Sequence, residues 1–188
     1  MKSPKIAILY NTTDGHTLTI CERIIYLLNQ QDLFPELFEI NHFDRMLGEY
    51  DLVLIGASIR YGHHHNNVID FIKDHKEELK QVKTAFFSVN LVARKPEKNT
   101  VKTNPYVIKF FKQVTWKPEL GAVFAGVLDY PRYGFFDRMM IKLIMKITGG
   151  PTTGDGPIEY TNWEHVEAFA QSIAKAVHAS TTDHVEMV

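Results

Sequence analysis

The residues best suited to chemistry lie in a hydroxyl-rich turn, Asn-Thr-Thr-Asp-Gly-His-Thr, at positions 11–17. The apolar run Ile6–Tyr10 precedes this turn, and an amphipathic stretch from Leu18 to Leu28 follows it. A buried strand, a polar turn and a helix in this order favour anion binding. The free N–H groups at the start of the helix point into the turn, and the helix dipole favours negative charge there. We therefore predict a phosphate site at residues 11–17.

The composition of the turn narrows the choice of phosphate ligand. It lacks both the Gly-x-x-x-x-Gly-Lys-Ser/Thr pattern of triphosphate loops and the Gly-x-Gly-x-x-Gly pattern of dinucleotide folds. The hydroxyls of Thr12, Thr13 and Thr17 instead form an uncharged cradle that suits one terminal phosphate, such as that of flavin mononucleotide (FMN). The alternative is ordinary helix capping, with Asn11 or Thr12 as the N-cap residue.

The elements that must position this turn follow from the order of apolar runs along the chain. The expected strands are Ile6–Tyr10, Pro35–Ile40, Tyr50–Gly56, Lys83–Val89 and Gly121–Gly126. The expected helices are Leu18–Leu28, Val68–Leu79, Pro105–Val114, Gly134–Ile147 and Asn162–Val177. Strands alternating with helices predict an α/β fold with a doubly wound, five-stranded parallel sheet covered on both faces. We expect one domain over residues 1–188, with a frayed tail at about 178–188.

Four loops are expected to follow the strands at the carboxyl edge of the sheet. Ligands of open α/β sheets bind at this edge. The predicted FMN contacts are Asn11, Thr12, Thr13, Asp14, Gly15, His16, Thr17, Ser58, Ile59, Arg60, Tyr61, Gly62, Asn90, Leu91 and Val92. Tyr61 or the backbone beside it would lie near the isoalloxazine ring, and the alternative is an aromatic side chain that only packs the loop. The basic residues expected to converge beside the flavin are Arg60, Arg94, Lys95, Lys98 and Arg132.

The segment at about 127–161 does not fit the alternation of strands and helices. Within it, Gly134–Ile147 is strongly apolar, and Arg138, Lys142 and Lys146 form one basic stripe on a helix. Such a helix is typical of contact with an anionic membrane surface or with a hydrophobic substrate. The residues expected to touch the membrane are Phe135, Phe136, Arg138, Met139, Lys142 and Lys146. The alternatives are a helix packed under a long loop with solvated lysines, and a surface that binds another copy of the chain.

Composition and charge exclude several classes of protein. The chain has 188 residues, of which 45% are hydrophobic and 23% charged, and its single cysteine, Cys21, leaves no internal disulfide framework. We expect no signal peptide and no membrane-spanning segment. Eleven basic and four acidic residues give positions 94–146 a charge of +7, while the rest of the chain carries −8. This asymmetry predicts a basic face for an anionic partner.

Other candidate sites are weaker. His63, His64 and His65 are adjacent in a loop and cannot all face one ion, so we expect a solvated helix start and no metal. The lysine-rich segment 94–112 lacks the interleaved aromatic residues of a base-stacking platform, so we expect no nucleic acid partner. We find no Ser-His-Asp or Cys-His arrangement for covalent hydrolysis, and we assign no catalytic residue.

Four segments together resemble one family. They are residues 11–17, Gly-Ala-Ser-Ile-Arg-Tyr-Gly-His at 56–63, the segment 86–98 and the segment 130–146. Over about residues 5–176 the chain is similar to the bacterial menaquinone-dependent protoporphyrinogen IX oxidases, which are flavodoxin-like. The phosphate loop is shared by flavodoxin-like proteins, whereas the later segments are much more specific. Asn11 departs from the usual Ser or Thr, although it can still accept a hydrogen bond.

The resemblance implies a flavodoxin-like sheet of strand order 2-1-3-4-5 with a helical insertion after strand five, and FMN as cofactor. It implies oxidation of protoporphyrinogen IX in haem synthesis, with electrons passed to menaquinone or ubiquinone. It also implies a peripheral protein on the cytoplasmic face of the inner membrane. Arg60, Arg94, Lys95 and Arg132 would then contact the substrate propionates or lie on the quinone side.

Two other functions share the fold and FMN. One is a soluble NAD(P)H:quinone reductase, which would react rapidly with a nicotinamide. The other is a flavodoxin-type electron carrier, but such carriers are typically acidic around the flavin, and the expected rim is basic in this chain. The oxidase therefore fits the charge distribution better than the carrier does.

Overall fold

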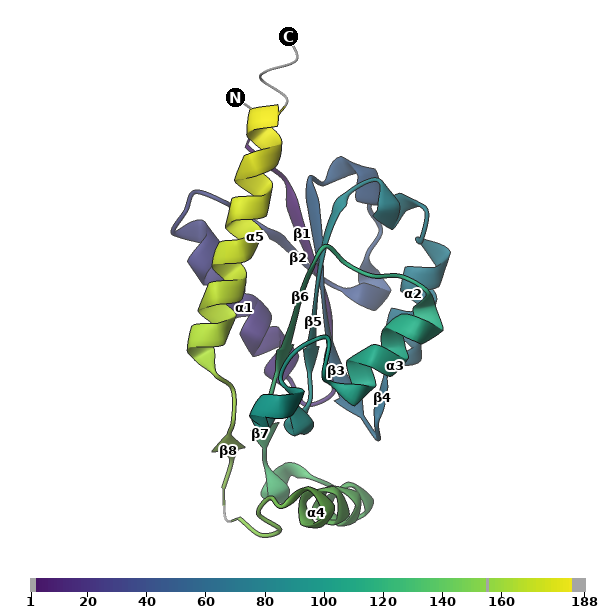
Figure 1. Cartoon of the computed structure of the whole chain (residues 1–188), viewed down its shortest axis with the longest axis vertical. Coiled ribbons are helices and arrows are strands. Elements are labelled where there is room, and N and C mark those ends of the chain that lie inside the picture. Colours follow the sequence, from purple (N-terminus) through teal and green to yellow (C-terminus); the bar gives the residue numbers. More distant parts are fainter. Residues whose placement is uncertain (1–2, 155, 184–188) are drawn as a thin grey trace.

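The computed structural model describes residues 3–154 and 156–183, and a parallel sheet lies at its centre (Figure 1). Five parallel strands have the order β2-β1-β3-β5-β6, and β4 pairs antiparallel with the end of β3. This confirms the predicted order 2-1-3-4-5, in which the fourth and fifth strands are β5 and β6. The strands are β1 (Ile6–Asn11), β2 (Glu36–Glu39), β3 (Leu52–Arg60), β4 (His63–His64), β5 (Lys83–Val89) and β6 (Leu120–Phe124).

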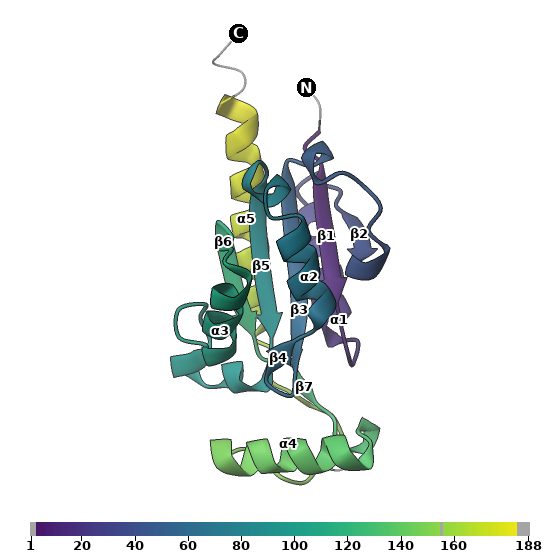
Figure 2. The ribbon, with the colours of Figure 1, turned by 90° about the vertical axis from the view of Figure 1, so that its right-hand side faces the viewer.

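Two pairs of helices cover the two faces of the sheet (Figures 1 and 2). One face carries α1 (His16–Asn29) and α5 (Trp163–Asp183), and the other carries α2 (Asn66–Asp74) and α3 (Pro105–Val114). Successive residues of a strand contribute to opposite cores, so that Leu54 packs with α1 and α5 whereas Ile55 packs with α2 and α3. Burial on both faces explains why these strands are continuous apolar runs.

The third strand is longer than predicted, and it ends in a hairpin. The expected strand ended at Gly56, but β3 continues to Arg60 and turns back into β4. Tyr61 and Gly62 form the turn with φ values of +51° and +80°. Positive φ at both central residues is the geometry of a two-residue type I′ hairpin, which matches the twist of the flanking strands. Residues 57–60 are therefore held by strand pairing, and only the turn itself is a loop.

Helix boundaries differ from prediction by more than two residues in two places. The expected helix Val68–Leu79 is α2 followed by a separate 3₁₀ turn, η3 (Glu78–Lys80), and the ring of His75 packs on Phe71 where α2 ends. Helix α5 continues to Asp183, so residues 178–183 are helical, and residues 184–188 of the expected frayed tail lie outside the described residues. The other 3₁₀ turns within the described chain are η1 (Ile40–His42), η2 (Leu47–Glu49), η4 (Leu91–Arg94) and η5 (Pro96–Lys98), together with η6 (Tyr130–Arg132) in the insertion.

The insertion places one helix across the carboxyl end of the sheet. Strands β7 (Val127–Leu128) and β8 (Ile158–Glu159) pair antiparallel, and between them α4 (Phe135–Thr148) lies apart from the two helical layers (Figure 2). A small separate core of Leu128, Tyr130, Tyr133 and Met145 holds the insertion together. Strands as short as β4, β7 and β8 have no recognisable apolar pattern, which is why the sequence did not predict them.

Candidate active site

The phosphate loop joins β1 to α1, and its polar groups gather at the start of the helix. Gly15 occupies the N-cap position with a φ of +90°, and no side chain caps the helix. The Thr12 hydroxyl accepts a hydrogen bond from the Gly15 N–H at 3.0 Å. The Thr17 hydroxyl is buried and has no hydrogen-bond partner among the described residues. Neither Asn11 nor Thr12 is the N-cap residue, so the structure favours an anion site over ordinary capping.

A largely apolar pocket opens beside this loop, at the carboxyl ends of the strands. Its walls come from the phosphate loop, the β3–β4 hairpin, the start of η4 and the β6–β7 connection. Helix α4 closes the far side with Met140, Ile141 and Ile144. Four segments that are distant in sequence therefore meet at the edge where ligands of this kind of sheet bind.

Most of the predicted FMN contacts line this pocket. They are Thr12, Asp14, His16, Thr17, Ser58, Ile59, Arg60, Tyr61, Gly62, Asn90, Leu91 and Val92. Asn11, Thr13 and Gly15 do not line it, although Gly15 borders a neighbouring cavity. The lining residues that the sequence did not single out are Val89, Tyr106, Ala125, Gly126, Val127, Tyr133, Met140, Ile141 and Ile144. All are apolar, aromatic or glycine residues, and the last three belong to the helix expected to contact a membrane or a hydrophobic substrate.

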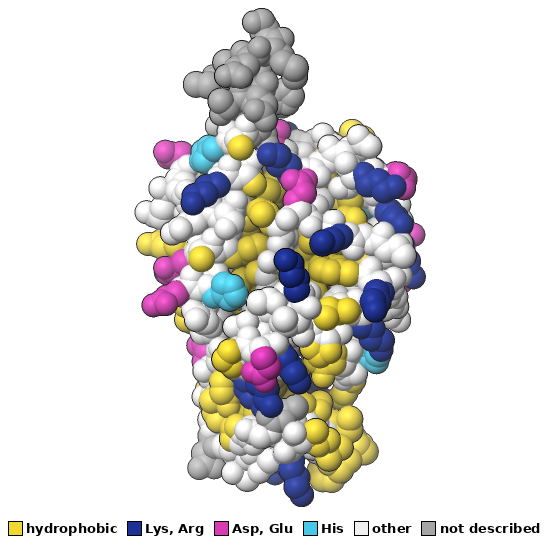
Figure 3. All heavy atoms as spheres, in the orientation of Figure 1, with side chains coloured by type: hydrophobic (Ala, Val, Ile, Leu, Met, Phe, Trp, Pro, Cys, Tyr) yellow, Lys and Arg dark blue, Asp and Glu magenta, His cyan; other side chains and the backbone are white. Residues whose placement is uncertain are grey.

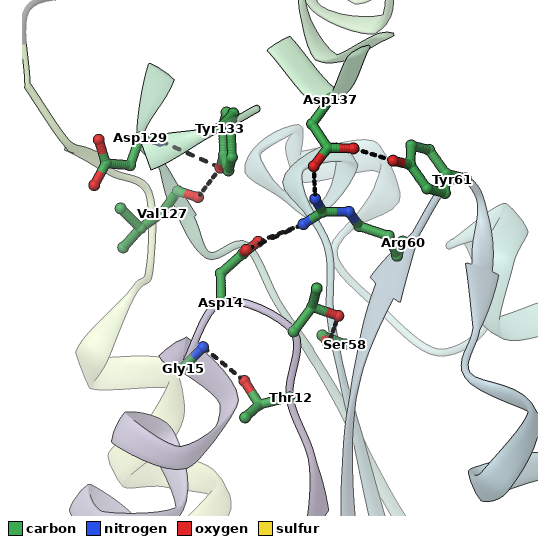
Figure 4. Close-up of polar contacts among 11 residues, drawn as sticks. Thr12, Asp14, Gly15, Ser58, Arg60, Tyr61, Val127, Asp129, Tyr133 and Asp137 are labelled. Atoms are coloured by element: carbon green, nitrogen blue, oxygen red, sulfur yellow. Dashed lines mark hydrogen bonds and ion pairs between the residues drawn. The ribbon is translucent and has the colours of Figure 1, made fainter. Parts of the chain in front are cut away.

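Arg60 connects the phosphate loop to the insertion (Figure 4). Its Nη1 donates to both carboxylate oxygens of Asp14 at 3.0 Å, and its Nη2 pairs with Asp137 of α4. The Tyr61 hydroxyl also donates to Asp137. This hydroxyl, and after it the Arg60 guanidinium, lower the pKa of Asp137 against an opposing effect of desolvation. One arginine thus joins β3, the phosphate loop and α4 at the edge of the pocket.

The other predicted basic residues do not converge on the pocket as expected. Arg132 borders a separate cavity beside Asp14 and His16, and Arg94 donates to the Leu91 carbonyl at 2.9 Å. Neither Arg94 nor Lys95 is among the residues that line the pocket. Arg94 ends η4, Lys95 follows it, and Arg132 lies in η6 of the insertion. Arg60 is the predicted cation that the structure places at the pocket.

Buried polar side chains hold the loop after β5. The His64 Nε2 lies 3.0 Å from the Ser88 hydroxyl, which accepts from Asn90 Nδ2 at 3.2 Å, and Asn104 Nδ2 donates to Asn90 Oδ1 at 3.1 Å. All four residues are buried. The expectation that all three adjacent histidines are solvated was wrong for His64, whose ring packs on Phe110. Burial, with a further effect of His63, lowers the pKa of His64 to about 3, so this histidine is neutral at pH 7.

Comparison with known proteins identifies the family of this chain. A profile described as a flavodoxin domain matches residues 7–155. The chain is 48% identical over 175 residues to protoporphyrinogen IX dehydrogenase (quinone) of Leishmania major, which covers 92% of this chain and 76% of that protein. It is 46% identical over 171 residues to the protein of the same name in Escherichia coli strain K12, with 90% of this chain and 94% of that protein covered. The chain belongs to the protoporphyrinogen IX dehydrogenase (quinone) family.

Solved structures support the fold assignment of this family member. The two-electron-reduced flavodoxin of Megasphaera elsdenii matches with a TM-score of 0.55 and 12% identity, covering 90% of this chain and 98% of that one. A short-chain flavodoxin associated with a bacterial microcompartment gives 0.53 and 13%, with 93% and 99% covered. The dehydrogenase family member therefore has a flavodoxin fold, as the sequence predicted.

The cofactor of this dehydrogenase family member is FMN, because a flavodoxin domain binds FMN, and the described residues fit it. The Thr17 hydroxyl, which has no hydrogen-bond partner in the described part of the chain, and the N–H groups at the start of α1 can donate to its phosphate. Tyr106 and the half-exposed Tyr61 offer aromatic surface to a flat ring at the pocket. The site thus combines a polar cradle for the phosphate with an apolar wall for the flavin.

Helix α4 of this dehydrogenase family member exposes large hydrophobic side chains to solvent. Phe135, Phe136 and Ile147 are exposed by 77%, 74% and 75%, and Figure 3 shows hydrophobic side chains gathered at this end of the molecule. Two of the three residues in the predicted basic stripe contact other parts of the protein. Arg138 donates to the carbonyls of Tyr130 and Tyr133 at 3.1 and 3.3 Å, while Lys142 lies over the Tyr130 ring. None of the described helices combines the length and the hydrophobicity that a membrane-spanning segment needs.

Proposed function

We propose that this protein uses FMN to oxidise protoporphyrinogen IX to protoporphyrin IX and passes the electrons to a quinone, either menaquinone or ubiquinone. The main structural support for the proposal is the pocket, in which apolar side chains of α4 lie beside Arg60 and the phosphate loop. An apolar macrocycle with two carboxylates matches an apolar wall next to a guanidinium. The names and the 46–48% identity of the relatives support the same reaction.

The protein's own residues bind and orient the FMN and the substrate. Bound FMN supplies the redox chemistry by accepting hydrogen from the substrate and returning electrons to the quinone. Thr12 and Thr17 hold the phosphate, and Met140, Ile141 and Ile144 exclude water from the substrate side of the pocket. Arg60 provides positive charge for a propionate, whereas Arg94, Lys95 and Arg132 would act farther out, on the path of substrate or quinone.

Anaerobic oxidation of protoporphyrinogen IX by the FMN-loaded protein tests this proposal, with porphyrin fluorescence as the readout. We expect turnover above the spontaneous rate only when a menaquinone or ubiquinone analogue is present, and comparison of the two analogues identifies the preferred acceptor. Absence of turnover would contradict the proposal. If the flavin were then reduced rapidly by NAD(P)H, the protein would be an NAD(P)H:quinone reductase instead.

We also propose that α4 holds the protein on an anionic membrane surface, at the cytoplasmic face of the inner membrane. Phe135, Phe136 and Met139 are exposed together, and Lys146 is exposed on the same helix. Apolar side chains that enter the acyl region and cations that meet head groups are typical of helices lying in a membrane interface. A helix of 14 residues suits this position and is too short to span a bilayer.

Paired serine substitutions at Phe135 and Phe136 test membrane contact, because both side chains are exposed and neither supports the core. We expect the variant to bind anionic liposomes at least about tenfold more weakly, since two large apolar side chains no longer enter the bilayer. Phe34→Ser is the matched control, because Phe34 is 67% exposed outside the insertion. Unchanged partitioning would reject the membrane role, and loss of a dimer in the variant alone would assign this surface to a second copy.

A further inference from the structure

Asp137 brings a carboxylate from the insertion to the edge of the pocket. It lies in the first turn of α4, and its two oxygens contact the Arg60 guanidinium and the Tyr61 hydroxyl (Figure 4). Helix α4 otherwise faces the pocket with the apolar side chains of Met140, Ile141 and Ile144. The position of Asp137 is therefore where a carboxylate of a bound ligand would meet the only cation that lines the pocket, among the residues the structure describes.

Arg60 does not need Asp137 for neutrality. The carboxylate of Asp14 already pairs with Nη1 through both oxygens at 3.0 Å, so the addition of Asp137 leaves the three groups with one excess negative charge. The side chains of Arg60 and Asp137 are 25% and 23% exposed. A partly exposed pair of this kind contributes modestly to stability, because water competes for both partners. The contact with Asp137 is therefore one that another carboxylate can replace.

Asp137 also has favourable surroundings without Arg60. Gly134 is the residue before α4, and no side chain caps the N-terminus of this helix. A carboxylate in the first turn interacts favourably with the positive end of the helix dipole and with the free N–H groups there. Release from Arg60 would therefore leave the carboxylate close to positive charge and to water, and the exchange carries a small cost.

We propose that Asp137 occupies on Arg60 the place of a substrate carboxylate, and that a propionate of the substrate displaces it when the substrate binds. This rests on the proposed function, because the substrate named there carries two propionates. Asp137 is then a specificity-determining residue because it competes for Arg60: a molecule that brings a carboxylate must displace it, whereas a molecule without one leaves the contact of Asp137 with Arg60 in place. Arg60 keeps its pairing with Asp14 throughout, so the phosphate loop stays in place during the exchange.

Asp137→Asn tests the exchange, because the amide keeps the shape and the hydrogen bond from Tyr61 but removes the competing charge. We expect protoporphyrin IX to bind about three- to fivefold more tightly to this variant, an effect typical of a partly exposed ion pair. The dimethyl ester of the porphyrin, which has no free carboxylate, should bind with unchanged affinity. Both affinities are measured by fluorescence quenching in detergent micelles, and KM values are compared for protoporphyrinogen IX and its dimethyl ester.

Asp129→Asn is the matched control, since it removes one carboxylate from the same insertion. The Asp129 carboxylate points away from Arg60 in Figure 4, so this variant should bind the diacid as the parent protein does. Weaker binding of the diacid by Asp137→Asn, or an equal change for diacid and ester, would overturn the inference. If the parent protein showed no quinone-dependent turnover, the proposed function would fail, while the binding comparison would still decide the role of Asp137.

Discussion

Thr17 is a residue whose side chain favours ligand binding at the expense of the stability of the ligand-free protein. Its hydroxyl is buried at the start of α1 with no hydrogen-bond partner among the described residues. A buried hydroxyl without a partner carries a desolvation cost that a ligand can relieve. Thr12 differs, because its hydroxyl already accepts a bond from the Gly15 N–H. The two threonines therefore have separable roles in the phosphate loop.

Thr17→Val should weaken FMN binding by about tenfold, because the phosphate loses one donor worth about 1.4 kcal/mol. The melting temperature of the FMN-free protein should stay the same or rise, since valine keeps the shape and removes an unpaired polar atom. Titration with FMN, followed by flavin fluorescence, and thermal unfolding without FMN measure the two effects.

Thr12→Val provides the contrast, because it should lower the stability of the FMN-free protein as well as FMN affinity. The Gly15 N–H would lose its partner in this variant. A Thr17→Val protein that melted well below the parent without FMN would show that the Thr17 hydroxyl is satisfied within the protein, and would contradict its role as a donor kept free for the phosphate.

The β3–β4 hairpin is the element that places Arg60 and Tyr61 at the pocket. Arg60 pairs with His63 and Ile59 with His64 across a two-residue turn. Tyr61 has a φ of +51°, which is uncommon for a residue with a large side chain. The strained turn brings the Tyr61 hydroxyl to Asp137. The conformation of the hairpin turn and the hydroxyl of Tyr61 therefore connect the sheet to α4.

Gly62→Ala should lower the free energy of unfolding by about 1 kcal/mol, because Gly62 has a φ of +80° and alanine pays a penalty there. Urea unfolding measures the loss. Gly48→Ala is the control, since Gly48 lies away from the site without a positive φ, and an added methyl group meets nothing within 4 Å. Equal stability of Gly62→Ala and the parent protein would indicate that the turn adopts another conformation.

The stability of the protein should depend on pH through the buried His64 and the partly buried His16. His64 has a pKa of about 3 in the folded protein, against about 6.5 in an unfolded chain. Burial also lowers the pKa of His16, against an opposing effect of Glu159. Between these values the unfolded chain binds more protons, so the stability is fully present above about pH 6.5 and is lost as the pH falls toward 3.

His64→Phe should remove a large part of this dependence, which for one proton amounts to about 1.4 kcal/mol per pH unit. Phenylalanine keeps an aromatic ring where the His64 ring now packs against Phe86 and Phe110. Urea unfolding at several pH values between about 7 and 4 gives the slope for each protein. His42→Gln is the control, because the His42 side chain is 78% exposed, and this variant should retain the parent slope. A parallel slope for parent and His64→Phe would assign the acid sensitivity to other groups.

Local patterns in the sequence were sufficient to predict the fold and the position of the phosphate loop. Continuous apolar runs of strand length and amphipathic stretches between them are local signals, because burial on both faces of a parallel sheet dictates which residue types occur there. The turn at residues 11–17 is likewise local, since its hydroxyls and N–H groups belong to one short segment. The insertion helix was predicted as Gly134–Ile147 and found as α4 at Phe135–Thr148 for the same reason.

The set of distant residues that share the pocket depends on how remote segments pack in three dimensions. Asp137 and Arg60 are 77 positions apart, and their contact depends on how the insertion lies across the sheet edge. His64 is buried beside Ser88 because a short hairpin places it there. Arg94 and Lys95 lie at the end of a short 3₁₀ turn and do not line the pocket. Elements this short show no periodic pattern in the sequence. Pairing and packing between remote segments set these positions, and no local property of the chain records them.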